Sequence, residues 1–90
     1  MEADLITVEF LGMPRQRAGR EKLRVKARTV GEMLRAVQET CPGLADLKRP
    51  DGCLAPHYLV SIDGKRFTSD DGDQLAGGAR VLILSADAGG

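Results

Sequence analysis

The sequence predicts an α+β fold in which one main helix packs across a mixed sheet of four to five strands, and three observations lead to it. Short segments near the start alternate apolar and polar residues, which is the period of a β-strand. Residues 29–43 instead place apolar side chains at helical spacing. The run at residues 80–85 is apolar at successive positions, which predicts a central strand buried on both faces.

Two strands are expected first, at residues 5–11 and 21–28, because apolar residues recur at every second position in both. The residues expected to face the core are Ile6, Val8 and Phe10 in the first strand and Leu23, Val25 and Ala27 in the second. The second strand has a basic outer face, which suits a solvated or edge strand. The intervening residues 12–20 contain two glycines and a proline, and they predict a flexible, basic hairpin loop.

The helix is expected to begin after Thr29, because Thr29 and Glu32 have the spacing of a capping box. The apolar positions that follow form one stripe, and they are Val30, Met33, Leu34, Val37 and Cys41. This stripe is expected to face the sheet, which is a sufficient explanation for Cys41. Pro42-Gly43 is expected to end the helix.

Three further strands are expected in the second half of the chain. Residues 58–62 form the third, the Asp63-Gly64 turn leads to a short strand at 65–67, and residues 80–85 form the last. One helix on such a mixed sheet defines the β-grasp architecture. Residues 1–85 are expected to form this single domain, and residues 86–90 a flexible tail.

Composition argues against several classes of function. The chain has 13 basic and 13 acidic residues, so no general attraction to nucleic acid or to a membrane is expected. The sequence contains no apolar run of about 20 residues and no signal-peptide pattern, so a cytoplasmic location is expected. The two cysteines, Cys41 and Cys53, lack metal-ligand spacing and are expected to be reduced thiols.

No side-chain pattern in the sequence predicts an active site, a metal site or a bound cofactor. His57 is the only histidine, and a general base needs a nucleophile or an orienting partner close by. The acidic stretch at residues 70–73 lacks the loop pattern and the terminal Glu of a calcium site. The tail therefore remains as the candidate reactive element.

The sequence ends in Gly89-Gly90, and only Ala86, Asp87 and Ala88 separate this pair from the last strand. An extended tail of this length projects about 15 Å. Glycine has no Cβ, so a narrow channel can admit the chain and a terminal carboxylate can reach a buried reagent. A carboxylate is a poor electrophile, but coupling to AMP gives a mixed anhydride that a sulfur nucleophile can attack.

Three stretches of the chain resemble the MoaD/ThiS family of sulfur carriers, and together they cover nearly its whole length. They are VEFLGMPRQRAG for the opening strand and loop, TVGEMLRAVQETCPGL for the helix, and LAGGARVLILSADAGG for the closing strand and diglycine tail. The resemblance implies a ubiquitin-like β-grasp fold. The chain departs from MoaD-type carriers in having no proline before the diglycine, so the resemblance implies the carrier class rather than one pathway.

The resemblance also implies a reaction and its partners. An E1-like adenylating enzyme of the MoeB/ThiF type, using ATP and Mg, would activate the carboxylate of Gly90, which would become a thiocarboxylate and donate sulfur through a synthase. The chain would act as a protein cosubstrate, or as the small subunit of a molybdopterin-synthase-like enzyme. The tail that contacts the partner would consist of Ser85, Ala86, Asp87, Ala88 and Gly89.

Two other classes of function stay open at this point. A ubiquitin-like modifier would use the same adenylate to join Gly90 to a lysine of a target, and a plain interaction module would not use Gly90 at all. The sulfur acceptor is also open, with molybdopterin, thiazole, cysteine, a tRNA base and a secondary metabolite as candidates. Asp87 either pairs with a basic residue of the activating enzyme or only keeps the tail soluble.

Overall fold

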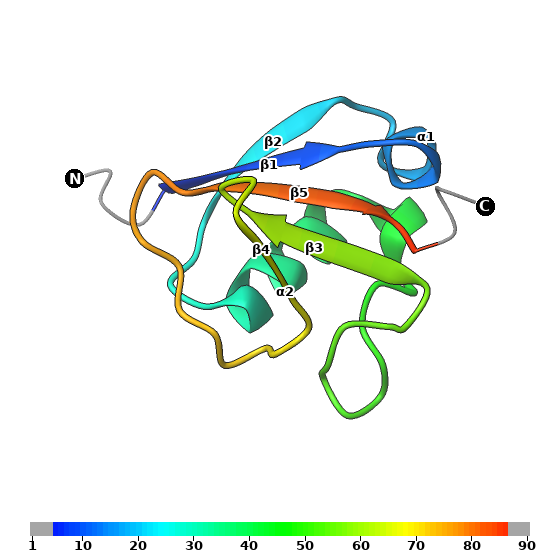
Figure 1. The fold of residues 1–90 in the computed structure, drawn as a ribbon. Coiled ribbons are helices and arrows are strands. Elements are labelled where there is room, and N and C mark those ends of the chain that lie inside the picture. The colour runs from blue at the N-terminus through cyan, green and yellow to red at the C-terminus, as the bar shows by residue number, and fades with distance from the viewer. Residues whose placement is uncertain (1–4, 87–90) are drawn as a thin grey trace.

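A computed structural model describes residues 5–86 of the 90-residue chain. The elements are β1 (Leu5–Phe10), α1 (Met13–Ala18), β2 (Lys22–Lys26), α2 (Val30–Thr40), the 3-10 helix η1 (Pro42–Leu44), β3 (Tyr58–Ile62), β4 (Arg66–Thr68) and β5 (Arg80–Ser85). Five strands form one mixed sheet in the order β2-β1-β5-β3-β4, and α2 crosses one of its faces (Figure 1). This arrangement confirms the predicted β-grasp fold.

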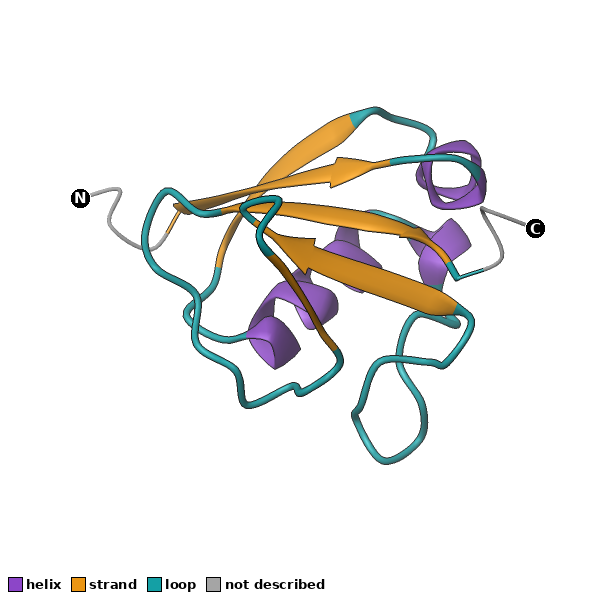
Figure 2. Cartoon of the chain, viewed as in Figure 1, coloured by secondary structure: helices purple, strands orange, loops and turns teal. Residues whose placement is uncertain are grey.

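The last strand, β5, occupies the centre of the sheet as predicted. It pairs in parallel with β1 and antiparallel with β3, while β2 and β4 form the edges. The prediction that β5 is buried on both faces is wrong, because Val81 and Ile83 are buried whereas Leu82 and Leu84 are only half-buried. Figure 2 shows the reason: α2 lies behind the sheet, and no described helix crosses the viewer's side of β3 and β5.

Alternation along β1 and β2 places the predicted side chains on the helix-covered face. Ile6, Val8 and Phe10 are buried in β1, and Val25 is buried in β2. Leu23 is half-buried, because β2 is an edge strand and has a neighbour on only one side. The outward residues of β2 are exposed, as the basic outer face predicted, and they are Lys22, Arg24 and Lys26.

The segment predicted as a flexible loop between these strands contains a helix, α1, and that prediction is therefore wrong. Pro14 is buried in the first turn, where its fixed φ and missing N–H are tolerated. Gly19 ends the helix with a left-handed φ of 73°, and its N–H donates to the carbonyl oxygen of Arg15 at 3.0 Å. The proline and glycine thus mark the two ends of a short helix.

The capping box of α2 forms with a shifted partner. The hydroxyl of Thr29 accepts a hydrogen bond from the N–H of Glu32 at 3.2 Å, as predicted. The carboxylate of Glu32 accepts from the N–H of Arg28 at 2.9 Å, one residue before the cap. Within α2, the buried residues are Val30, Met33, Leu34 and Val37. The helix ends at Thr40, and Pro42 begins η1.

The β3–β4 hairpin is shifted by one residue from its predicted position. Asp63 and Gly64 have positive φ values of 54° and 65°, so both adopt the left-handed conformation of a tight hairpin turn. The N–H of Lys65 donates to the carbonyl oxygen of Ile62 at 3.0 Å, which makes Lys65 part of the turn. The strand β4 therefore begins at Arg66. Within residues 5–86, no helix is both long enough and apolar enough to cross a membrane.

We expect Leu34→Ala to lower the free energy of unfolding by about 2–5 kcal/mol, because the side chain is fully buried between α2 and the sheet and its removal leaves a cavity. Chemical denaturation provides the measurement. Arg35→Ala, at the exposed neighbouring position of the same helix, is the matched control and is expected to change stability by less than about 0.5 kcal/mol. Equal effects of the two variants would contradict the packing of α2 on the sheet.

Candidate functional site

The structure describes the root of the predicted tail. Ser85 is the last residue of β5 and is half-buried, and Ala86 follows it and is exposed. The other predicted site residues lie outside the described residues, and they are Asp87, Ala88, Gly89 and Gly90. The flexibility predicted for the tail therefore stays a prediction for these four residues.

Hydrogen bonds hold the end of β5 on both sides. Ser85 pairs with Tyr58 at the end of the β3 ladder, and the N–H of Ala86 donates to the carbonyl oxygen of His57 at 2.8 Å. On the β1 side, the N–H of Leu11 donates to the carbonyl oxygen of Ile83 at 3.0 Å. Both neighbours thus fix β5 up to Ile83, and β3 alone pairs with its last two residues, from which the tail leaves.

A polar cluster lies beside this root, and it was not predicted. It consists of Arg17, Asp46, His57 and Tyr58, which we call the root cluster. The carboxylate of Asp46 accepts hydrogen bonds from the Tyr58 hydroxyl at 2.7 Å and from Arg17 Nη1 at 2.8 Å. His57 Nε2 lies 3.0 Å from Asp46 Oδ2, and Arg17 Nη1 also donates to the Tyr58 hydroxyl at 3.1 Å.

The members of the root cluster are far apart in the sequence, which explains why no motif revealed them. Asp46 lies 29 residues from Arg17 and 11 from His57. The one available signal was that the only histidine and the only tyrosine are adjacent at the start of a predicted strand. Their rings lie 4.4 Å apart between centroids. His57, for which no partner was predicted, therefore has an orienting carboxylate.

The root cluster keeps a negative charge on Asp46. Burial alone would raise the pKa of this carboxyl group, but hydrogen bonds from Tyr58, His57 and Arg17 outweigh it and lower the pKa to about 2. Burial and the adjacent Asp46 raise the pKa of Tyr58, so its hydroxyl stays protonated and can donate. At neutral pH the cluster is thus a carboxylate with three donors around it.

A close backbone approach brings Arg17 to this cluster. A Cβ at Gly43 would overlap the backbone carbonyl of Arg17, so α1 and η1 can pack this tightly only with glycine there. Pro42-Gly43, which the sequence predicted only as the end of a helix, therefore also positions α1 against the loop that carries Asp46. Gln38 supports that loop from α2, because its Nε2 donates to the carbonyl oxygen of Ala45 at 2.9 Å.

The uncovered face of the sheet carries an apolar patch close to the end of β5. We call it the open-face patch, and it consists of Leu11, Leu59, Leu82, Leu84 and Phe67. Phe67 is 64% exposed and Leu11 48% exposed, while the other three are half-buried. Leu59 lies opposite Leu84 across the β3–β5 ladder. Leu11 and Leu82 line one groove of about 330 Å³, and Leu59 and Phe67 line a second of about 200 Å³.

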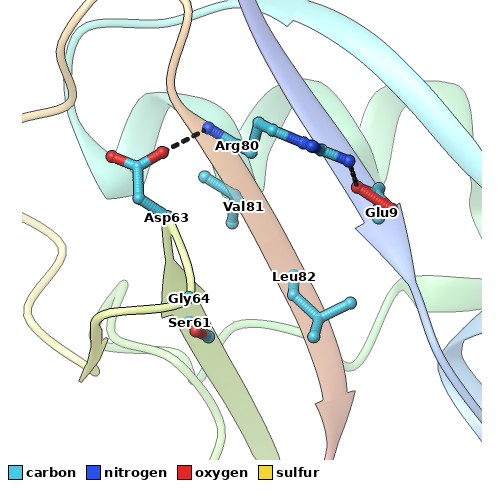
Figure 3. A pocket seen from close by; sticks show the side chains of 7 residues that line it. All are labelled: Glu9, Ser61, Asp63, Gly64, Arg80, Val81 and Leu82. Carbon is cyan, nitrogen blue, oxygen red and sulfur yellow. Dashed lines mark hydrogen bonds and ion pairs between the residues drawn. The ribbon is translucent and has the colours of Figure 1, made fainter.

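A third depression, of about 320 Å³, lies at the opposite end of β5 (Figure 3). Arg80 reaches from β5 across to Glu9 on β1 at 2.7 Å, and the Asp63 carboxylate accepts from the backbone N–H of Arg80 at 2.9 Å. The charged groups here are paired with one another, and the lining contains no histidine or cysteine. Among residues 5–86, no group of three His, Cys, Asp or Glu side chains could hold a metal ion.

The two cysteines are free thiols, and neither belongs to the sites described above. Cys41 is buried at the end of α2, and Cys53 is half-buried. The nearby Asp51 raises the pKa of the Cys53 thiol, which disfavours the thiolate that nucleophilic chemistry requires. Neither cysteine among the described residues is therefore an activated nucleophile. The features near the end of β5 are a hydrogen-bonded strand end, the root cluster and the open-face patch.

Solved structures of other proteins have the same fold, although no protein-family model and no curated protein match the sequence. SAMP1 from Haloferax volcanii is 24% identical with a TM-score of 0.81, over 96% of this chain and 99% of that chain. A chain of the Amycolatopsis orientalis BexX/CysO complex is 21% identical with a TM-score of 0.78, over 94% and 99%. A chain of the complex between subunits 1 and 2 of the Helicobacter pylori 26695 molybdopterin-converting factor is 20% identical with a TM-score of 0.62, over 96% and 99%. The sequence resembles MoaD-type carriers, and the fold of the chain is also similar to these solved structures.

We expect Asp46→Asn to lower the free energy of unfolding by at most about 1 kcal/mol at neutral pH, because the Asp46 side chain is 45% exposed and solvent screens the interaction. The pKa of Asp46 is about 2 in the folded protein and 3.8 ordinarily, so its charge stabilises the fold above about pH 4. That contribution is lost as the pH falls from about 4 to about 2. The stability difference between the two proteins, measured by urea denaturation, should shrink over this range. A difference that stays constant down to pH 2 would show that the charge of Asp46 is not involved.

Proposed function

We propose that this chain is a sulfur carrier whose reactive group is the carboxylate of Gly90. The observation that carries the proposal is the course of the chain: a central strand, paired with both neighbours up to Ile83 and with β3 up to Ser85, leads through three small or short residues to Gly89-Gly90. The fold similarity to CysO and to a molybdopterin-converting factor complex supports it. The described residues provide no activated nucleophile that would compete with a terminal carboxylate.

The proposed reaction has two steps. A carboxylate oxygen of Gly90 attacks the α-phosphorus of ATP and releases pyrophosphate, and Mg held by the activating enzyme balances the phosphate charge. A sulfide nucleophile then attacks the acyl carbon of the mixed anhydride, and AMP leaves with the electron pair of the broken C–O bond. The product is a C-terminal thiocarboxylate, whose sulfur a synthase transfers to its acceptor. The chain would take part as a protein cosubstrate of a cytoplasmic pathway.

The open-face patch is the proposed docking surface for an E1-like adenylating enzyme of the MoeB/ThiF type. The patch is apolar and uncovered, and it lies on the strand that leads to the tail, so a partner seated there would also be close to the root of the tail. Partner binding is supported by two proteins of the same fold that form complexes, CysO with BexX and a molybdopterin-converting factor subunit with the other subunit. Phe67 is 64% exposed, and aromatic residues including Phe are enriched at protein–protein interfaces.

The first experiment tests Gly90 directly. Incubation with ATP, magnesium, a MoeB/ThiF-type enzyme and sulfide should replace one terminal oxygen by sulfur, which intact-protein and C-terminal peptide mass spectrometry detect. Deleting Gly90 shortens the tail by about 3.5 Å and should abolish the reaction, because transfer needs near-contact geometry. The double variant Cys41→Ser, Cys53→Ser is the control and should react normally. Sulfur on a cysteine, or normal adenylation of the truncated chain, would refute the carrier function.

Proteomics of diglycine remnants on lysines distinguishes the alternative use of the carboxylate as a modifier, and the adenylation assay distinguishes a plain interaction module. A ubiquitin-like modifier would form the adenylate but would appear in cells as Gly90 joined to lysines of other proteins. A plain interaction module would form no adenylate at all. Chains with one residue added after Gly90 should not be activated unless a protease removes it, because the carboxylate is then displaced.

The second experiment tests the docking surface. We expect Phe67→Ser to raise the KM for the carrier in adenylation at least about fivefold, because truncating an interface hot spot costs more than about 1 kcal/mol. Met13→Ser is the matched control, since Met13 is 53% exposed but lies on α1, outside the open-face patch. Pyrophosphate exchange measures both values. Equal KM values for the two variants would exclude the open-face patch as the docking surface.

A further inference from the structure

We propose that Asp46 is a positioning residue that fixes the root of the tail, by holding in place the two residues that form the last hydrogen-bonded contacts of β5. The effect on adenylation rests on the proposed function. The hold on Ala86 does not, because it follows from the contacts of the described residues. The role proposed for Asp46 is indirect, because it acts through His57 and Tyr58 on the root of the tail.

The first step concerns the last hydrogen bond before the tail. The N–H of Ala86 donates to the carbonyl oxygen of His57, and Ala86 is exposed and lies beyond the end of β5. β5 pairs with both β1 and β3 up to Ile83 and with β3 alone at its last two residues, but the Ala86 contact depends on His57 alone. The order of Ala86 therefore depends on how firmly the backbone of His57 is held.

The second step concerns what holds His57. It ends the irregular segment 45–57, in which Lys48 and Leu54 form an isolated bridge, so regular structure fixes it only weakly. Its side chain lies within hydrogen-bonding distance of Asp46, and so does the side chain of the next residue, Tyr58. One carboxylate thus binds two consecutive residues, and these are the residues that contact Ala86 and Ser85.

The third step concerns what holds Asp46. Arg17 donates to its carboxylate from α1, and Gly43 lets the backbone of α1 approach η1 closely. The charged and titratable groups that face Asp46 are Arg17, His57 and Tyr58, and all three act as donors that favour its ionised form. The carboxylate is therefore the one acceptor shared by α1, the loop and the start of β3. No other described side chain bonds to all three.

The fourth step links the root to activation. The sequence predicts a flexible tail, and such a tail would have to become ordered when the enzyme aligns the carboxylate with the α-phosphate, with each freed residue adding backbone entropy to that cost. With the Ala86 hydrogen bond intact, ordering begins after Ala86; without it, at least one further residue must be ordered. The free-energy cost of ordering one residue corresponds to about fivefold to thirtyfold weaker binding. The loss should appear in KM, because the bound complexes are alike once formed.

The test uses a graded series in the full chain. Asp46→Ala removes both acceptor oxygens, Asp46→Asn keeps one, and Tyr58→Phe removes a single donor while its ring stays. Asp51→Ala is the matched control, because Asp51 lies in the same segment but pairs with Arg49. Solvent-exchange NMR of the free carrier measures the Ala86 amide, with the amide of Ile83 reporting whether the fold is intact. Adenylation kinetics then give KM and kcat separately.

We expect faster exchange at Ala86, about fivefold for Asp46→Ala, which corresponds to loss of one hydrogen bond, with smaller effects for the other two variants. The KM should rise in the same order, while kcat and the Ile83 amide stay unchanged. Unchanged Ala86 exchange in Asp46→Ala, or an equal change in Asp51→Ala, would overturn the proposal. A fall in kcat at constant KM would also overturn it, since Asp46 would then act in the chemistry. If the wild-type chain is not adenylated, the proposed function fails, while the exchange data still decide whether Asp46 holds the root.

Discussion

Val30, Met33, Leu34 and Val37 of α2 are fully buried against one face of the sheet, and the rest of the structure is arranged around that contact. The chain has little aromatic material, with two phenylalanines and one tyrosine, so close aliphatic packing has to supply most of its apolar burial. A single helix can cover only one side of a five-stranded sheet. The other side is left open, and the apolar residues that remain there are available to a partner.

The central position of β5 combines two properties that the proposed carrier function needs. Its neighbours β1 and β3 make the strand rigid, and its end lies at the surface beside α1, where a tail can leave the domain (Figure 1). Tyr58 and Ser85 are the last residue pair of the β3–β5 ladder, and Asp46 of the root cluster binds the Tyr58 hydroxyl from a loop outside the sheet. A rigid base with a narrow end allows a partner to bind the domain on one surface and use the tail in its own active site.

Local patterns in the sequence were sufficient for most of the fold. Alternation identified β1 and β2, and the capping box with its apolar stripe identified α2, because these elements bury one face each. The helix α1 was missed because Pro14 and Gly19 also occur in loops, and only packing of Pro14 decides between the two. Burial on both faces of β5 was predicted wrongly, because a continuous apolar run does not reveal whether a second layer covers it.

The candidate site was predictable only where its chemistry is local. Gly89-Gly90 is visible as a motif, but the root cluster forms from residues on three separate segments, and only the fold brings them together. Gly43 illustrates the same limit. Its sequence context indicates the end of a helix, while its close approach to Arg17 depends on where α1 packs.

The exposed basic residues of β2 have a consequence for how copies of the chain meet. An edge strand presents unpaired backbone groups that another strand can join. If two copies approached through β2, Lys22, Arg24 and Lys26 of one would lie against the same residues of the other, and like charges opposite each other repel. At the other edge, β4 has only three residues and offers a short ladder. Both edges of the sheet thus disfavour strand pairing between two copies of the chain. Copies at high concentration can stay separate while their open faces remain accessible.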